Sequence, residues 1–213
     1  MKARVASPAQ IGGPVWQPKD SIRAFLACPL SETIIIAARR VQEQAVSTGV
    51  PLRLVSPESL HLTLAFLGHV EPDRLDYLLP SLQRDLSEIP PTRQGVSAVT
   101  VLPERGPARV VCLVLAGDAG LQKVHTVTQS HVTRSGIAVD RRPFLPHVTV
   151  ARVARTAREV EHRALRQTSE SLRVPRQLPS LLDRVVLYQS DLLPGGPKYS
   201  ILGSCQLRGE ELV

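Results

Sequence analysis

The sequence predicts an α+β fold, because strand-like and helix-like segments alternate without a regular strand–helix repeat. Consecutive strands are expected within residues 95–116 and again within 183–207, whereas a doubly wound sheet would place a helix after each strand. The chain has 213 residues, enough for one domain or for two small lobes that share a core. Hydrophobic residues make up 43% and charged residues 21%, as in soluble globular proteins, which excludes a disordered chain.

Hydrophobic periodicity assigns the elements of the first half of the chain. The expected elements are a strand over 22–29, a helix over 31–49, a strand over 61–68, a helix over 71–88, and strands over 94–102 and 108–117. Proline has no N–H to donate within a helix, so we expect the helix over 71–88 to bend or restart at Pro80.

The second half continues in the same way. Its expected elements are a helix over 118–136, a strand over 144–154, a helix over 156–172, and final strands over 183–192 and 198–207. No strand is followed by G-x-G-x-x-G or by a Walker A sequence. Dinucleotide-binding and P-loop folds are therefore excluded.

The termini suggest a simple domain organisation. Residues 1–20 are rich in proline and glycine and have no hydrophobic period, so we expect an N-terminal extension, one two-lobed domain over 21–207 and a tail over 208–213. No apolar run approaches the roughly 20 residues that cross a bilayer. The first ten residues lack the apolar core of a secretory signal, which indicates a cytoplasmic protein. We expect a monomer that contacts no membrane.

The basic charge is concentrated in arginine. The formal net charge is +7, and the stretch 141–176 contains nine arginines but only three acidic residues. Guanidinium groups pair well with phosphate, which favours an RNA or nucleotide partner. Biased composition and a solvated helix face would give the same pattern. Aromatic residues are only 3% of the chain, so stacking along a long single strand is not supported.

Three H-x-T triplets stand out, and two of them have matching contexts. His61-Leu62-Thr63 and His147-Val148-Thr149 each begin a predicted strand after a proline-containing turn, and they lie 86 residues apart. The third triplet, His131-Val132-Thr133, falls in a predicted helix, which turns its histidine and threonine to different faces. We interpret His131 as a surface residue.

Strand periodicity predicts which side chains of the two matched triplets lie together. In the first strand His61, Thr63 and Ala65 are expected on one face, and Leu62, Leu64 and Phe66 on the other. In the second strand His147, Thr149 and Ala151 are expected to share a face, backed by Val148 and Val150. Each strand thus presents one imidazole and one hydroxyl on the same side.

Two imidazoles and two hydroxyls suit the cleavage of a phosphoester without a metal. A neutral imidazole can take a proton from water, and a protonated imidazole can give one to the leaving oxygen. The hydroxyls of Thr63 and Thr149 would hold the non-bridging phosphoryl oxygens. No H-E-x-x-H or carboxylate cluster accompanies either histidine, which disfavours a metallohydrolase.

The two strands, with their flanks, resemble those of the 2H phosphoesterase superfamily. The sequences HLTLAFLG and HVTVAR are similar to its two H-x-T motifs. The flanking sequences SPESLHLTLAFLGHV and DRRPFLPHVTVARV resemble the RNA 2′,3′-cyclic phosphodiesterase branch, also called 2′-5′ RNA ligases. The resemblance covers residues 21–207. It implies a two-lobed, pseudo-symmetric fold in which antiparallel sheets are flanked by helices and the histidines face one another across a central catalytic cleft.

The resemblance also implies roles for single residues and the substrate class. It makes His61 the general acid and His147 the general base, and it places Thr63 and Thr149 at phosphate-holding positions. Arg152, at the end of the second motif, either stabilises its strand or contacts RNA, and Arg142 is a second candidate RNA contact. The implied partners are RNA with 2′,3′-cyclic phosphate ends or cyclic nucleotides, with no cofactor and no metal.

Two alternatives stay open at this point. The same site could join RNA ends through a 2′-5′ linkage, since ligation is the reverse of cleavage. The chain could instead be a non-catalytic module that binds nucleotides or RNA, in which the histidines only grip phosphate. Binding alone would not require two titratable groups, which favours the enzyme.

Overall fold

The computed structural model describes residues 21–210 except 117, 141, 170, 175–179 and 195. The expected N-terminal extension, Arg141, Arg176 and the last three residues of the expected tail lie outside this part. Its elements in chain order are β1 (Ile22–Pro29), α1 (Glu32–Val46), β2 (Leu52–Leu54), the 3₁₀ turn Pro57–Ser59, β3 (His61–Val70), α2 (Pro72–Ser87), β4 (Thr92–Gln94), β5 (Val96–Leu102), β6 (Val110–Leu115), α3 (Ala119–Arg134), β7 (His147–Val153), α4 (Glu159–Ser169), β8 (Ser180–Leu182), β9 (Arg184–Leu193) and β10 (Gly196–Gln206).

The main sheet confirms the α+β class and has two halves. It has eight antiparallel strands, of which seven run in the order β10-β9-β1-β3-β7-β6-β5, and the eighth, β2, pairs with β7. We call β10, β9, β1 and β3 the first half-sheet, and β7, β6, β5 and β2 the second half-sheet. The two halves are joined through β3 and β7, whose Cα register in the described chain is the single pair Leu62↔Val148. The short strands β2, β4 and β8 were not expected from the sequence.

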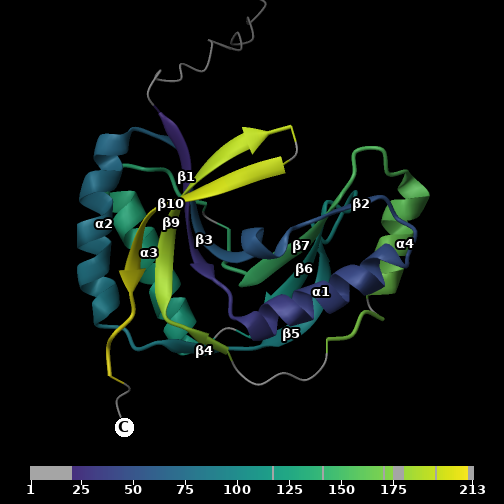
Figure 1. The fold of residues 1–213 in the computed structure, drawn as a ribbon, viewed down its shortest axis with the longest axis horizontal. Helices are drawn as coiled ribbons and strands as arrows, with labels where there is room; N and C mark the ends of the chain where they lie inside the picture. The colour runs from purple at the N-terminus through teal and green to yellow at the C-terminus, as the bar shows by residue number, and fades with distance from the viewer. Residues whose placement is uncertain are drawn as a thin grey trace, which may run out of the picture.

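Each half-sheet is covered by two helices, which supports the expected two-lobed arrangement. Helices α2 and α3 lie together on one side of the molecule, and α1 and α4 lie on the other (Figure 1). Helix α2 packs against β10 and α3, and α3 packs against β3, whereas α1 packs against β7 and α4 against β5. None of the helices in the described residues is long and apolar enough to span a bilayer.

The chain crosses between the halves at α1 and α3. Helix α1 follows β1 of the first half-sheet but packs on β7 of the second, and α3 follows β6 of the second half-sheet but packs on β3 of the first. The side chain of Ser31 caps the start of α1 by accepting from the Ile34 N–H, and Asp118 caps α3 by accepting from Leu121. Each half-sheet is therefore covered in part by a helix that follows a strand of the other half-sheet in the chain.

Helix α2 continues through Pro80, so of the expected bend or restart there, the restart does not occur. Its buried positions are Leu75, Leu78, Leu82 and Leu86, at helical spacing on both sides of the proline. Burial of a leucine side chain is worth roughly 2 kcal/mol. The apolar stripe is thus sufficient to hold one helix in spite of the missing N–H.

The simple alternation predicted for the first motif strand holds only as far as its fourth residue. Leu26 of β1 is paired with Ala65, but the next residue, Ala27, is paired with Thr63, so Leu64 is an extra residue in β3. Leu64 and Ala65 are both buried, and Phe66 is 61% exposed. A β-bulge of this kind reverses the side on which the following residues point. Ala65 and Phe66 therefore lie on the opposite faces from those predicted.

The second motif strand has the same irregularity at the equivalent position. Val111 of β6 is paired with Ala151, but Cys112 is paired with Thr149, so Val150 is the extra residue in β7. Val150 and Ala151 are both fully buried, which corrects the predicted face of Ala151. Arg152 follows as an exposed residue. The bulges make Phe66 and Arg152 equivalent positions, each three residues after the motif threonine.

Candidate functional site

The four predicted residues come together where the two half-sheets meet. Leu62 and Val148, the middle residues of the two triplets, are opposite each other and fully buried. An antiparallel register through this pair sets His61 across from Thr149 and Thr63 across from His147. All four flanking side chains are half-buried and point away from the buried face. We call this group the H-x-T site.

Both imidazoles are oriented by the same local hydrogen bond. The Nδ1 atom of His61 lies 2.7 Å from the carbonyl oxygen of Ser59, and Nδ1 of His147 lies 2.8 Å from that of Leu145. A carbonyl can only accept, so Nδ1 carries the proton in each ring. In the described part of the chain neither Nε2 has a hydrogen-bond partner. Each histidine therefore presents Nε2 for proton transfer.

Aromatic side chains surround His61 and were not identified from the sequence. The ring of Phe25 lies 4.8 Å from that of His61, and Tyr199 meets His61 edge-on at 5.3 Å. Tyr188 stacks on Phe25 at 5.2 Å, and Phe66 lies 6.4 Å from Phe25. The chain has only three phenylalanines and three tyrosines, and four of these six gather here. They come from β1, β3, β9 and β10, so only the sheet order could reveal the cluster.

The environment of His61 changes its titration. Burial lowers the pKa of His61, the hydrogen bond to Ser59 opposes this change, and the positive charges of Arg152 and His147 lower the pKa further. Desolvation disfavours the charged form of an imidazole. These surroundings thus favour the neutral form of His61.

This shift predicts a dependence of stability on pH. A histidine whose pKa is lower in the folded protein than in the unfolded chain stabilises the fold above its unfolded pKa, about 6.5, and loses that contribution as the pH falls through the folded value. We expect the unfolding temperature to fall between about pH 8 and pH 5, a range above the titration of most carboxylates. His61→Phe should flatten this slope, and exposed His69→Phe should not. Equal slopes in all three proteins would contradict the assignment.

The two candidate arginines have different surroundings. Arg152 follows the bulge of β7, three residues after Thr149, and its charge lowers the pKa of His61. Arg142 instead forms an ion pair with Asp140, two residues away, and its side chain is 85% exposed. Within the described chain, Arg152 thus acts on His61 through its charge, whereas Arg142 has no contact with either histidine.

Several other arginines of the basic stretch have local partners. Arg158 pairs with Glu161 and Arg163 with Glu159, both within α4. Arg166 donates to the carbonyl oxygens of Pro103 and Gly106, which fixes α4 to the turn between β5 and β6. These contacts fit the alternative of a solvated helix face for this part of the stretch.

A match to a family model gives the family of the chain. The model of the 2′-5′ RNA ligase superfamily matches residues 35–192, which include both H-x-T strands. The chain belongs to the 2′-5′ RNA ligase superfamily.

Two relatives that share one name are similar over most of the chain. An RNA 2′,3′-cyclic phosphodiesterase of Thermotoga maritima is 27% identical over 188 residues, covering 88% of this chain and 97% of the relative. A protein of the same name from Methanothermobacter thermautotrophicus is 27% identical, and the match covers 84% of this chain and 95% of the relative.

Solved structures agree with the fold. A crystal structure of a Thermus thermophilus protein matches with a TM-score of 0.73 and 27% identity, covering 89% of this chain and all of the other. Escherichia coli LigT in complex with 3′-AMP matches with a TM-score of 0.65 and 24% identity, covering 88% of this chain and 98% of LigT.

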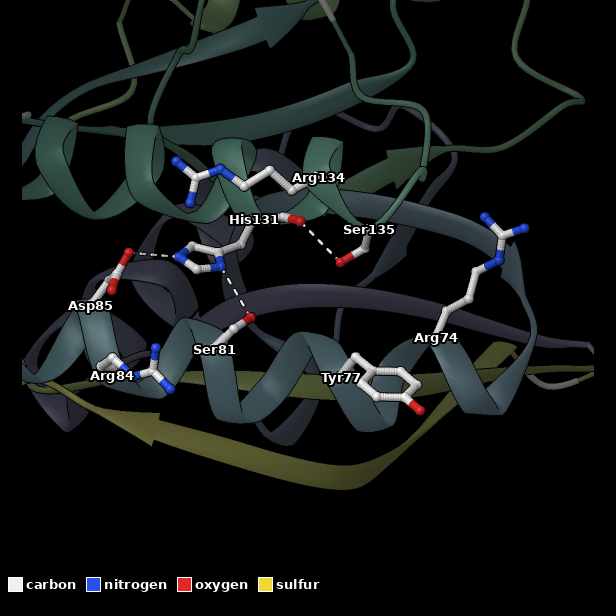
Figure 2. A pocket seen from close by; sticks show the side chains of 8 residues that line it. All are labelled: Arg74, Tyr77, Ser81, Arg84, Asp85, His131, Arg134 and Ser135. Carbon is white, nitrogen blue, oxygen red and sulfur yellow. Dashed lines mark hydrogen bonds and ion pairs between the residues drawn. The ribbon is translucent and has the colours of Figure 1, made fainter.

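His131, the third H-x-T histidine, is not the surface residue that we predicted. It is only 6% exposed. Its Nε2 lies 2.8 Å from Asp85 Oδ2 and its Nδ1 3.1 Å from Ser81 Oγ. Figure 2 shows the ring between α2 and α3 beside a pocket of about 520 Å³. Helical spacing could have revealed this, because Leu121, Val124 and Thr128 are also buried, at intervals of three and four residues.

In this member of the superfamily His131 joins two helices and lies apart from the H-x-T site. His131→Ala removes an almost buried ring and both of its hydrogen bonds, so we expect the free energy of unfolding to fall by roughly 2–3 kcal/mol. Turnover should stay close to that of the wild type. Denaturant unfolding measures the first quantity. His69→Ala, at an exposed histidine, is the control and should change stability by less than about 0.5 kcal/mol.

Proposed function

We propose that the protein hydrolyses RNA or nucleotide 2′,3′-cyclic phosphates to 2′-phosphomonoesters, with His61 as general acid and His147 as general base and without a metal. One observation carries this proposal. Two imidazoles with the same Nδ1–carbonyl hydrogen bond present Nε2 on one face, each across from the other motif's threonine. The relatives named RNA 2′,3′-cyclic phosphodiesterase support the choice of substrate.

Hydrolysis needs a base for the attacking water. With Nδ1–H bonded to Leu145, the neutral His147 ring has a free lone pair on Nε2. That atom takes a proton as the water oxygen attacks phosphorus. A second proton must reach the departing ribose oxygen.

His61 supplies that second proton. In the protonated ring Nδ1–H stays bonded to Ser59 and Nε2–H points to the leaving 3′ oxygen, so the P–O3′ bond breaks as the proton is transferred. The product carries a 2′-phosphate and a 3′-hydroxyl. Burial disfavours protonated His61, but a bound phosphate anion offsets this, because opposite charge favours the imidazolium form.

The remaining groups suit an anionic nucleotide. The hydroxyls of Thr63 and Thr149 can donate to non-bridging oxygens, and Thr149 Oγ1 is itself 3.8 Å from the buried Cys112 Sγ. The guanidinium of Arg152 adds positive charge where the transition state gains negative charge. The exposed ring of Phe66 offers a face on which a base can stack, an interaction worth roughly 1–3 kcal/mol.

The assay that tests this function uses an oligonucleotide with a 2′,3′-cyclic phosphate end. We expect a 2′-phosphate product, formed at the same rate in excess EDTA, because acid, base and phosphate clamp are all side chains. Loss of turnover in EDTA that a divalent ion restores would support the metallohydrolase instead. Adding a partner with a 5′-hydroxyl tests the ligation alternative, for which a joined product is expected. Tight binding without either product would indicate the non-catalytic module.

A further inference from the structure

Helix α3 carries a glutamine that reaches the first motif strand. Gln129 Nε2 donates to the carbonyl oxygen of Leu64 at 2.8 Å, and Leu64 is the extra residue of the bulge directly after Thr63. The same Nε2 lies 3.2 Å from Nε2 of His125, one turn earlier on α3. This second hydrogen bond requires an unprotonated His125 Nε2. Burial lowers the pKa of His125, which favours that form.

His125 extends this connection to the second motif. Its ring stacks on Phe144, with centroids 3.8 Å apart and an interplanar angle of 6°. The next residue, Leu145, provides the carbonyl that holds Nδ1 of His147. Gln129 is thus linked directly to the strand of the first motif, and through His125 to the loop that orients the histidine of the second.

Helix α1 carries the equivalent glutamine for the other half. Gln42 is 7% exposed, and its Nε2 donates to the carbonyl oxygen of Val150 at 2.8 Å. Val150 is the extra residue of the bulge in β7, directly after Thr149. The second Gln42 hydrogen bond, 2.7 Å long, goes to the carbonyl oxygen of Val55, in the segment that leads to His61.

We propose that Gln42 and Gln129 are a matched pair of positioning residues, each of which fixes the bulged strand of one H-x-T motif and the loop before the histidine of the other. This positioning role rests on the proposed function of the H-x-T site. A bulge residue falls outside the regular ladder, and a buried carbonyl needs a donor. The Gln129 amide supplies a donor to the bulge carbonyl of Leu64, and the Gln42 amide adds a second donor to that of Val150, which also accepts from the Val55 N–H at 2.9 Å. Their second N–H couples the motifs through helices that cross between the half-sheets.

The test replaces each glutamine by an apolar side chain of similar length. Gln42→Met and Gln129→Met should each lower kcat by roughly 10- to 100-fold while KM changes by less than about threefold, because small displacements of catalytic groups act mainly on the chemical step. The substrate is a 2′,3′-cyclic mononucleotide. Gln44→Met on α1 and Thr128→Val on α3 are matched controls. Gln44 Nε2 donates to the carbonyl oxygens of Arg40 and Arg173, away from both motifs, and the buried Thr128 hydroxyl has no hydrogen-bond partner in the described part.

A second measurement needs no substrate. The ¹⁵N chemical shifts of histidine side chains report which ring nitrogen carries the proton, and the wild type should show His61 and His147 protonated on Nδ1. Gln42→Met should loosen this preference at His61, and Gln129→Met at His147, each leaving the other histidine as its internal control. Circular dichroism confirms that each variant is folded at the temperature used.

The outcomes separate this inference from the proposed function. Wild-type kcat and wild-type histidine signals in either Met variant would overturn the pairing. Equal losses in Gln44→Met or Thr128→Val would also overturn it, because they would indicate general weakening of the helices. A wild-type protein that does not hydrolyse the cyclic phosphate would refute the proposed function, whereas the crossed change in histidine signals would still support the positioning role.

Discussion

His61→Ala and His147→Ala should each lower turnover of a 2′,3′-cyclic phosphate by roughly 10²- to 10⁴-fold, the usual contribution of a positioned acid or base. Each substitution removes one of the two Nε2 atoms that the structure leaves available for proton transfer. The double variant should be little worse than the worse single variant, because an acid and a base that act in one step are not additive. Steady-state kinetics on purified, folded proteins measure these effects.

The pH dependence of the rate gives a further readout for these variants. The wild type should show a bell-shaped profile, and each single variant should lose one limb. His131→Ala and His69→Ala are the controls and should keep wild-type turnover, since neither side chain contacts the H-x-T site. A folded His61→Ala or His147→Ala protein with full turnover would refute the proposed mechanism, and a large loss in His131→Ala would show that the wrong triplet had been set aside.

Arg152→Ala should lower kcat/KM by roughly 10²- to 10³-fold, the range for loss of one group that stabilises transition-state charge. Its charge lowers the pKa of His61, and it lies three residues after Thr149, so we expect the same charge to act on a phosphate held between the histidines. Arg142→Ala is the matched control from the same basic stretch and should have little effect, because Arg142 is exposed and paired with Asp140.

A second variant and a second substrate show how Arg152 acts. Arg152→Lys keeps the charge but loses the planar fork of donors, so it should recover only part of the activity. The loss in Arg152→Ala should be similar for a cyclic mononucleotide and for an oligonucleotide if Arg152 acts on the reacting phosphate. A loss confined to the oligonucleotide would instead assign Arg152 to the RNA backbone, and equal activity of Arg152→Ala and Arg142→Ala would remove it from the site.

Features that depend only on neighbouring residues in the chain could be predicted from the sequence. The matched contexts of His61 and His147 separated them from His131, and helical spacing predicted α1 and α3 to within a few residues of their observed bounds. The predicted pairing of each histidine with a threonine on one face also agrees with the structure, because Leu62 and Val148 between them are buried. These features depend only on periods of two and 3.6 residues.

Features that depend on register or on distant contacts could not be predicted in this way. The bulges at Leu64 and Val150 appear only when the partner strands are known, and they reversed the predicted side for Phe66. The aromatic cluster at His61 needs β9 and β10, which lie more than 120 residues further along the chain, to pair beside β1. The burial of His131 follows from its helical spacing with Leu121, Val124 and Thr128, whereas the surface interpretation considered only that the triplet lies in a helix.

The crossing of α1 and α3 has a consequence for how the chain folds. A fragment that ends after β6 would lack β7, the strand on which α1 packs, and the remaining fragment would begin with α3 but lack β3. Each fragment would thus expose an apolar helix face whose partner is in the other. Neither fragment is then an autonomous folding unit, and the two lobes should unfold in one cooperative transition. Cutting the chain in the loop between β6 and α3 should yield two pieces that fold only as a complex.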